Sequence, residues 1–158
     1  MKALTLWQPW ASLVVEECKP YEFRGWRAPD SIIGQRIVIH ASARKPDMRE
    51  VDRLLRLLEA GGRYAAQTCL KPVDRAIELL LQGSWPLGAG IGTAIVGEPR
   101  NGFDIGVDFG AIKVNDSSRD YHANWGWPVL KIERWPEPVP MRGALGLWNW
   151  PSPESVGL

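Results

Sequence analysis

The sequence predicts an α+β fold: a small mixed β-barrel with flanking helices and one helical insertion. Short stretches typical of strands lie on both sides of a central region with helical periodicity. Strands and helices do not alternate regularly enough for a doubly wound sheet. The glycines of Gly88-x-Gly90-x-Gly92 precede a strand instead of opening a helix, so they do not form a dinucleotide-binding fingerprint. We therefore expect no cofactor of that type, and nothing else in the sequence indicates one.

The first 41 residues are predicted to contain three strands and one helix. Residues 2–6 alternate as a short strand, and Pro9 suits the first position of a helix that continues to about Cys18. Residues 21–26 alternate in an extended segment. Residues 36–41 give the clearest strand, because three successive residues are β-branched.

Residues 46–82 have a helical period. A first helix begins near Met48 and ends at Gly61-Gly62, because glycine readily adopts the conformation that ends helices. A second helix is expected from about residue 72 to residue 82. The predicted buried faces are Met48, Val51, Leu54, Leu55 and Leu58 on the first helix and Val73, Ala76, Ile77 and Leu80 on the second.

The C-terminal half returns to strands. Residues 92–96 and 128–135 are predicted strands, whereas the Gly- and Asp-rich residues 101–119 are expected to form a surface excursion. The prolines of residues 136–140 indicate a spacer, and residues 143–150 form the closing segment.

Composition narrows the class of protein. Of the 158 residues, 45% are hydrophobic and 23% are charged, as in ordinary globular proteins. The sequence has no run of 18 apolar residues and no basic-then-apolar leader, so we expect a cytoplasmic protein without a membrane partner. Two cysteines and two histidines without metal-ligand spacing predict no metal site. The net charge is only +1. Many of the nine tryptophans must lie in the core, whereas those beside polar and basic residues can stack on bases.

Four motifs span most of the chain. They are KALTLWQPWA at residues 2–11, K-x-x-E-x-R-x-W at residues 19–26, G-x-x-I-V-I-H-A at residues 34–41, and a strand, proline spacer and G-x-L-G-x-W ending within residues 125–148. In this order they resemble the ASCH family of the PUA-like superfamily. The resemblance implies one domain over residues 1–150 with a variable insertion at residues 43–87, followed by a tail at residues 151–158. It also implies a link to RNA.

The K-x-x-E-x-R-x-W motif supplies the first candidate site residues. Extended backbone places Glu22, Arg24 and Trp26 on one face, where the guanidinium can position a phosphate or carbonyl. Lys19 can contact a phosphate or, if desolvated, transfer a proton. The alternative is a structural Glu–Arg pair that holds the strand to the barrel.

Other candidates lie around that motif. His40 can act as a general acid or base if it faces the cleft, or it is a core histidine bonded to backbone. Gln8 can hydrogen-bond a base edge at the helix start, and Trp10 either stacks on a base or packs in the core. Arg44 and Lys45 extend a phosphate track or form a solvated patch.

A polar loop with interleaved aromatic residues precedes the last long strand. Its side chains are candidates for the opposite lip of the cleft, and a solvated loop is the alternative. The candidates are Arg119 and Asn124 as ligand contacts and Tyr121 as a catalytic acid.

Three activities fit these residues. The first is binding of RNA, single-stranded nucleic acid or a nucleotide through a cationic cleft. The second is a metal-independent ribonuclease using Lys19, His40, Arg24 and Tyr121. The third is an amidohydrolase of N4-acylated cytidine. The resemblance there implies K-x-x-T-x-R, but Glu22 stands in place of the threonine and could act only as a base toward water.

Overall fold

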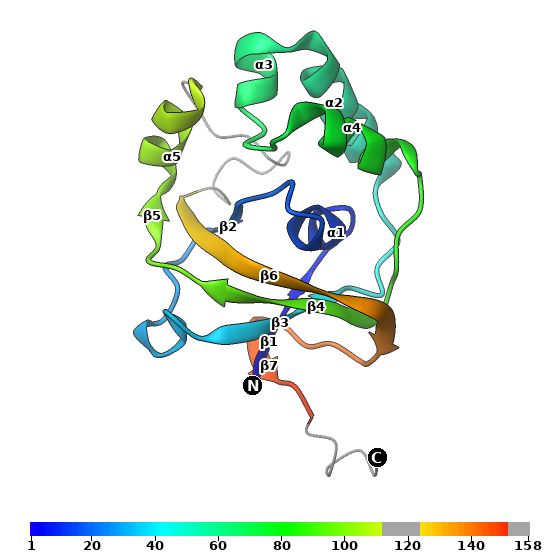
Figure 1. Ribbon diagram of the computed structural model, residues 1–158, viewed down its shortest axis with the longest axis vertical. Helices are drawn as coiled ribbons and strands as arrows, with labels where there is room; N and C mark the ends of the chain where they lie inside the picture. Colours follow the sequence, from blue (N-terminus) through cyan, green and yellow to red (C-terminus); the bar gives the residue numbers. More distant parts are fainter. Residues whose placement is uncertain (112–123, 152–158) are drawn as a thin grey trace.

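The computed structural model describes residues 1–111 and 124–151. Seven strands form one curled sheet, in which the path runs β2-β6-β4-β3-β1-β7 and β5 pairs with β6. The strands are β1 Lys2–Leu6, β2 Tyr21–Arg24, β3 Arg36–Ala41, β4 Ala89–Val96, β5 Arg100–Asn101, β6 Trp125–Pro140 and β7 Leu147–Asn149. Figure 1 shows the sheet as a half-barrel with helices on its upper side. The predicted α+β barrel class is thereby confirmed.

Strand pairing explains how distant motifs meet. β1 pairs in parallel with β3, with Thr5 opposite His40, and antiparallel with β7, with Ala3 opposite Trp148. Strand β2 pairs with the start of β6, with Glu22 opposite Trp127. The first, second, third and last motifs of the sequence therefore lie in one sheet.

The sheet buries its core against α1, the helix Trp10–Val15. Leu4, Ile39 and Trp127 are among the buried side chains of this core, together with Val14 of the helix. Helix α1 is shorter than predicted: Glu17 has a φ of 60°, and the amides of Cys18 and Lys19 both donate to the carbonyl of Leu13. This left-handed turn ends the helix before Cys18.

The predicted insertion is helical. It contains α2 Met48–Ala60, α3 Gly62–Ala66 and α4 Val73–Leu81. The three helices enclose a second hydrophobic cluster that includes Leu54, Leu58 and Leu80 and also Leu13 of α1. Figure 1 shows α1 between these helices and the sheet. Apolar residues on both sides of α1 thus join the insertion to the barrel.

The short helix α3 was not predicted. Gly61 and Gly62 both have positive φ and end α2 as expected, but the chain resumes helical geometry at once.

The second hydrophobic cluster, which includes Leu54 and Leu58, also buries Cys18. This burial raises the pKa of the Cys18 thiol above the ordinary value.

The predicted spacer at residues 136–140 is instead the end of β6. Gly90 pairs with Val139 and Ala89 with Pro140. Proline cannot donate to a neighbouring strand, so it is tolerated only where its nitrogen faces away from the ladder. The register between β4 and β6 shifts between Arg134 and Val139, so Pro136 and Pro138 lie at an irregularity of the ladder, where a missing donor is tolerated.

The predicted surface excursion at residues 101–119 contains a helix. Helix α5, Gly102–Phe109, begins where the Asn101 side chain accepts a hydrogen bond from the amide of Phe103, and it ends at Gly110 in the left-handed conformation. Ile105 is buried against Phe23 and Cys69. Residues 112–119 of the excursion lie outside the described residues.

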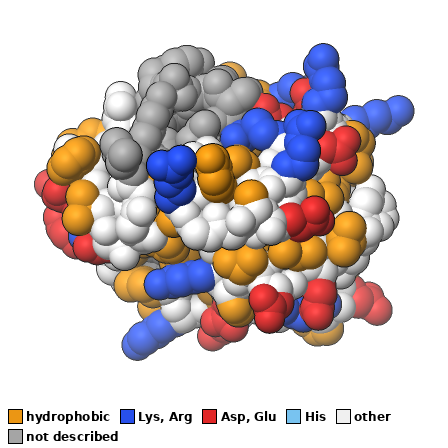
Figure 2. Space-filling view, turned by 90° about the horizontal axis from the view of Figure 1, so that it is seen from above, with side chains coloured by type: hydrophobic (Ala, Val, Ile, Leu, Met, Phe, Trp, Pro, Cys, Tyr) orange, Lys and Arg blue, Asp and Glu red, His pale blue; other side chains and the backbone are white. Residues whose placement is uncertain are grey.

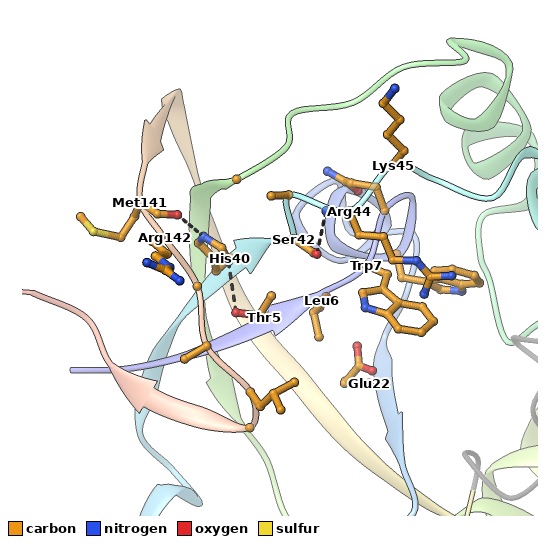
Figure 3. A pocket seen from close by; sticks show the side chains of 18 of the residues that line it. Thr5, Leu6, Trp7, Glu22, His40, Ser42, Arg44, Lys45, Met141 and Arg142 are labelled. Atoms are coloured by element: carbon orange, nitrogen blue, oxygen red, sulfur yellow. Dashed lines mark hydrogen bonds between the residues drawn. The ribbon is translucent and has the colours of Figure 1, made fainter.

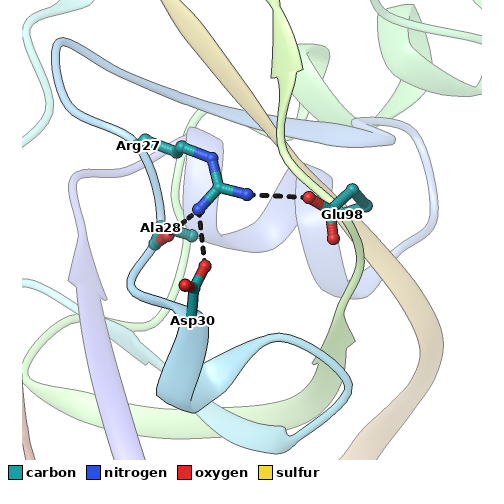
Figure 4. A network of polar contacts seen from close by, with 4 residues as sticks. All are labelled: Arg27, Ala28, Asp30 and Glu98. Atoms are coloured by element: carbon teal, nitrogen blue, oxygen red, sulfur yellow. Dashed lines mark hydrogen bonds and ion pairs between the residues drawn. The ribbon is translucent and has the colours of Figure 1, made fainter.

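A polar clamp closes the turn between β2 and β3, which includes the short 3-10 helix η1, Asp30–Ile32. Arg27 donates to Asp30 at 2.8 Å and to Glu98 at 2.7 Å (Figure 4). It also donates to the carbonyl of Ala28. The hydrogen bond to Asp30 is the largest cause that raises the pKa of Arg27 above its ordinary value.

Within the described residues, no helix is both long enough and apolar enough to cross a membrane.

Candidate functional site

A cleft of about 1060 Å³ opens where β1, β2 and β3 approach one another. Most of its lining comes from four parts of the chain that are far apart in sequence, and Glu50 of α2 and Gly88 complete its walls. The four parts are the end of β1 with the segment that follows it, β2, residues 42–47 after β3, and residues 141–146 after β6. The volume is at the upper end of the range for small-molecule sites, so the cleft has room for a nucleotide.

The floor of the cleft is a hydrogen-bonded chain through Thr5 and His40. The Nε2 of His40 lies 2.6 Å from the carbonyl oxygen of Met141, and its Nδ1 lies 3.1 Å from the Thr5 hydroxyl. The indole Nε1 of Trp148 donates to the same hydroxyl at 2.9 Å. His40 is 1% exposed, and both of its nitrogens have partners within the chain. Its position fits the core-histidine interpretation, although its ring borders the cleft.

Gly143 lies directly against this chain. A Cβ at position 143 would lie 2.6 Å from His40 Cε1 and 2.8 Å from the Thr5 hydroxyl. Only glycine therefore lets the segment from Met141 to Gly146 pack so closely on His40. The close packing fixes this segment as one wall of the cleft.

Glu22 and Arg24 lie on the same face of β2, as predicted from the period of two, and both line the cleft. The Nε of Arg24 lies 3.7 Å from Oε1 of Glu22. Its Nη2 donates to the carbonyl of Thr5 at 3.2 Å. Strand β2 is one edge strand of the sheet, and β1 is the neighbour of β7, the strand at the other end of the path. The hydrogen bond of Arg24 therefore also links the two ends of the half-barrel.

Lys19 lies elsewhere. It is 1% exposed, and its Nζ is 4.8 Å from the centre of the Phe23 ring, which points to the opposite side of β2 from Glu22 and Arg24. Lys19 does not line the described part of the cleft. Of the three charged residues of the motif, Glu22 and Arg24 line the described part of the cleft.

Trp7 is the most exposed of the aromatic side chains that line the described part of the cleft. It is 41% exposed, and the Arg44 guanidinium lies 3.7 Å from the centre of its ring (Figure 3). Trp10 also lines the cleft but packs partly against the helical cluster. Trp26 follows the end of β2 and does not line the cleft; it packs edge-on against Trp127 at 4.8 Å.

Gln8 is a structural residue of the helix start. Its side-chain nitrogen donates to the Ser12 hydroxyl and to the carbonyl of Pro86, both at 2.8 Å, and its oxygen accepts from the Ser12 amide. These bonds use both amide hydrogens of a side chain that is 1% exposed. Gln8 lines the cleft wall without offering it a donor.

Charged side chains surround the mouth of the cleft. Arg44 and Lys45 are exposed on one side, and Arg142 is exposed on the opposite side. Two acidic residues of the wall have partners: Asp47 accepts the Arg49 amide at the start of α2, and Glu50 lies 3.4 Å from Arg53. The amide hydrogen bond lowers the pKa of Asp47.

Elsewhere the surface is mixed. On the face of the molecule that carries the helical insertion, Lys and Arg side chains are mixed with Asp and Glu side chains (Figure 2). Within the described residues, no group of three or more His, Cys, Asp or Glu side chains is placed to hold a metal ion.

The predicted opposite lip is described only at its end. Arg119 and Tyr121 lie outside the described residues. Asn124 is exposed beside the start of β6, where its backbone carbonyl accepts from the amide of Gly102, and it does not line the described part of the cleft.

Sequence reasoning missed several residues of the cleft, among them Arg142 and Thr5. Arg142 occupies the side that the loop was expected to supply, and its only sequence signal is that it stands next to the G-x-L-G-x-W motif. Thr5 joins Arg24, His40 and Trp148 through its carbonyl and hydroxyl groups. A threonine in an alternating strand carries no such signal.

The curled half-barrel, with one helix in its concavity and a cleft at one end, places the protein in the PUA-like class of α+β folds. It resembles a solved structure described as "Crystal structure of ASCH from Zymomonas mobilis", with a TM-score of 0.53 and 14% identity over 99% of this chain and 90% of that one. The chain therefore has an ASCH-type fold. No protein-family model matches the sequence, and no curated protein is similar to it in a sequence search.

Proposed function

We propose that the protein binds single-stranded RNA, or a nucleotide unit of it, in this cleft. The observation that carries the proposal is the combination of an exposed indole at Trp7 with exposed cations on both sides of the mouth. Aromatic rings that stack on bases and cations that contact phosphates are the two components of single-strand recognition. Arg44 is on the same side as Trp7, and Arg142 approaches from the other.

Weak, salt-sensitive binding is expected. The net charge of the whole chain is only +1, so long-range attraction to RNA is small and the contacts within the cleft must provide most of the affinity. Such a protein selects its ligand through a few well-placed groups rather than through a basic surface. Cys18 is a buried, free cysteine, which fits a reducing compartment, so we place this activity in the cytoplasm.

Binding without turnover is better supported than the ribonuclease. A general base needs a nitrogen or oxygen that can reach the 2′-hydroxyl. Both nitrogens of His40 already have partners in Thr5 and Met141, and Lys19 does not line the described part of the cleft. The amidohydrolase is disfavoured because Glu22 replaces the threonine of that motif.

The test is a titration of a fluorescently labelled single-stranded RNA with protein, followed by fluorescence anisotropy at several salt concentrations. We expect the double variant Arg44→Ala/Lys45→Ala to bind more weakly. If it loses two phosphate contacts, the slope of log K against log salt should decrease in magnitude by about 1.4. The charge-matched control is Arg56→Ala/Arg63→Ala, which removes two exposed cations of the helical insertion. Equal losses in both double variants would mean that binding depends on overall charge and not on the cleft.

The same RNA, incubated in EDTA, separates binding from cleavage. We expect it to remain intact while its mobility in a native gel is shifted. Cleavage products that disappear in Lys19→Ala and His40→Ala would instead establish the ribonuclease. Release of acetate from N4-acetylcytidine, lost in Glu22→Gln, would establish the amidohydrolase.

A further inference from the structure

We infer that the cleft selects a guanine base, whose Watson–Crick edge is read by the carboxylate of Glu22. This inference rests on the proposed function, because it names the part of the RNA that the same cleft recognises. It concerns a residue that backbone binding of RNA does not require. A carboxylate repels phosphate, so we expect Glu22, inside a cleft rimmed by cations, to contact a part of the RNA other than its phosphates.

Glu22 is held rigidly at the side of the cleft. It lies in the middle of β2, opposite Trp127 of β6, and is only 5% exposed. The Nε of Arg24 lies 3.7 Å from Oε1, and Arg24 itself is fixed to the carbonyl of Thr5. A group positioned by a strand and an ion pair can discriminate between ligands more sharply than a loop residue.

Glu22 also faces an aromatic surface. Both Glu22 and Trp7 line the cleft, and Figure 3 shows the Glu22 carboxylate directed towards the Trp7 indole. Single-stranded RNA is commonly recognised by stacking a base on an aromatic ring while polar groups read the edge of that base. A base stacked on Trp7 would present its edge to Glu22.

The chemistry of the four bases then favours guanine. A carboxylate only accepts hydrogen bonds, and its two oxygens offer about four acceptor positions, so donors from a ligand can be accommodated beside contacts within the chain. Guanine has two neighbouring donors on its Watson–Crick edge, the N1 hydrogen and the N2 amino group. Cytosine and adenine place one amino donor beside a ring acceptor. Uracil has one N–H between two carbonyl oxygens that a carboxylate repels.

Burial strengthens this preference. Hydrogen bonds to an ionised group are stronger than those between neutral groups, and a low local dielectric strengthens them further. The same low dielectric makes binding less favourable for a base that turns a hydrogen-bond acceptor towards the Glu22 carboxylate. We therefore expect guanine to be preferred over uracil by at least about tenfold in Kd, since one additional charge-assisted hydrogen bond is worth at least that factor.

The experiment uses five-nucleotide RNAs that differ only in the central base of a uridine background: guanine, hypoxanthine, cytosine, adenine or uracil. Affinities are measured by fluorescence anisotropy with the unaltered protein. We expect the guanine RNA to bind at least about tenfold more tightly than the uracil RNA. The hypoxanthine RNA should lose much of this advantage, because hypoxanthine lacks only the N2 amino group. This comparison changes no protein residue, so it holds even if a Glu22 variant folds poorly.

The variant Glu22→Gln should then reduce the guanine preference, because an amide replaces one acceptor with a donor. Glu59→Gln, on an exposed part of α2, should retain it. If all five RNAs bind equally, or if another base is preferred, the guanine inference is wrong while the proposed RNA binding stands. If none of the RNAs binds, the proposed function fails and the inference with it.

Discussion

The Nε2 of His40 lies 2.6 Å from the carbonyl oxygen of Met141, and this contact links the ring to the segment that follows β6. A carbonyl oxygen only accepts, so Nε2 carries a hydrogen. The Thr5 hydroxyl accepts from Trp148 and can therefore donate its own hydrogen to Nδ1 of His40. Each hydrogen bond of this chain then has one donor and one acceptor. The arrangement joins the wall formed by residues 141–146 to the centre of the sheet.

Replacing His40 with alanine should destabilise the protein. The substitution removes a buried side chain and leaves the Met141 carbonyl and the Thr5 hydroxyl without this partner, so we expect the free energy of unfolding to fall by about 2–4 kcal/mol. Urea denaturation followed by tryptophan fluorescence measures it. A second readout is limited trypsin digestion, in which cleavage after Arg142 should become faster once its segment is no longer held. Unchanged stability and unchanged digestion would show that His40 does not anchor this wall.

The elements with strong local signals could be predicted from sequence. Three β-branched residues in succession predicted residues 36–41 as a strand, and β3 has these bounds. Apolar spacing followed by two glycines predicted a helix from Met48 to Gly61, and α2 occupies that range. The strand through Pro136–Pro140 could not be predicted in this way. A proline fits in a strand only where no neighbouring strand needs its missing N–H, and the sequence does not show where the neighbouring strand lies.

The cleft was predictable only in part, for a similar reason. A period of two places Glu22 and Arg24 on one face wherever β2 lies, so their proximity follows from sequence alone. Lys19 stands two residues after Glu17, and the left-handed turn at Glu17 determines its direction. Arg142 reaches the cleft because β6 pairs with β4 and β4 pairs with β3, which brings the residues around position 140 close to His40. Such long-range contacts leave no periodic pattern.

The start of α2 should give the protein a small dependence on pH. Asp47 accepts the Arg49 amide at 3.0 Å, and this hydrogen bond lowers its pKa. A lowered pKa in the folded state means that the stabilisation is present above the ordinary carboxyl pKa and is lost as pH falls through the lowered value. We expect Asp47→Ala to lower the melting temperature at neutral pH, and less so in acid.

Asp47→Asn is the matched variant for this helix start. Asparagine also caps helices but does not titrate, so the variant should keep the stability at neutral pH and lose this part of the acid dependence. Asp52→Ala, at an exposed position within α2, removes a carboxylate that makes no cap. Melting curves between neutral and acidic pH, followed by circular dichroism, distinguish the variants. Equal effects of Asp47→Ala and Asp52→Ala would attribute the change to charge rather than to capping.

Trp7 and Trp26 provide a matched pair for the stacking step of the proposed function. They are 41% and 43% exposed, but only Trp7 lines the cleft. Stacking of one base on an aromatic side chain contributes about 1–3 kcal/mol to binding. Trp7→Ala should therefore weaken RNA binding by that amount, whereas Trp7→Phe should retain most of the affinity because phenylalanine preserves an aromatic face.

Trp26→Phe is the control for Trp7, since it keeps a ring against Trp127 and should leave the affinity unchanged. Anisotropy titrations measure all three variants, and their melting temperatures check that each is folded. A Trp7→Ala protein that binds as tightly as the parent would exclude stacking on Trp7. A loss on changing Trp26 instead would place the RNA beyond the end of β2, where Trp26 packs against Trp127 outside the cleft lining. The two tryptophans thus locate the ligand surface by affinity alone.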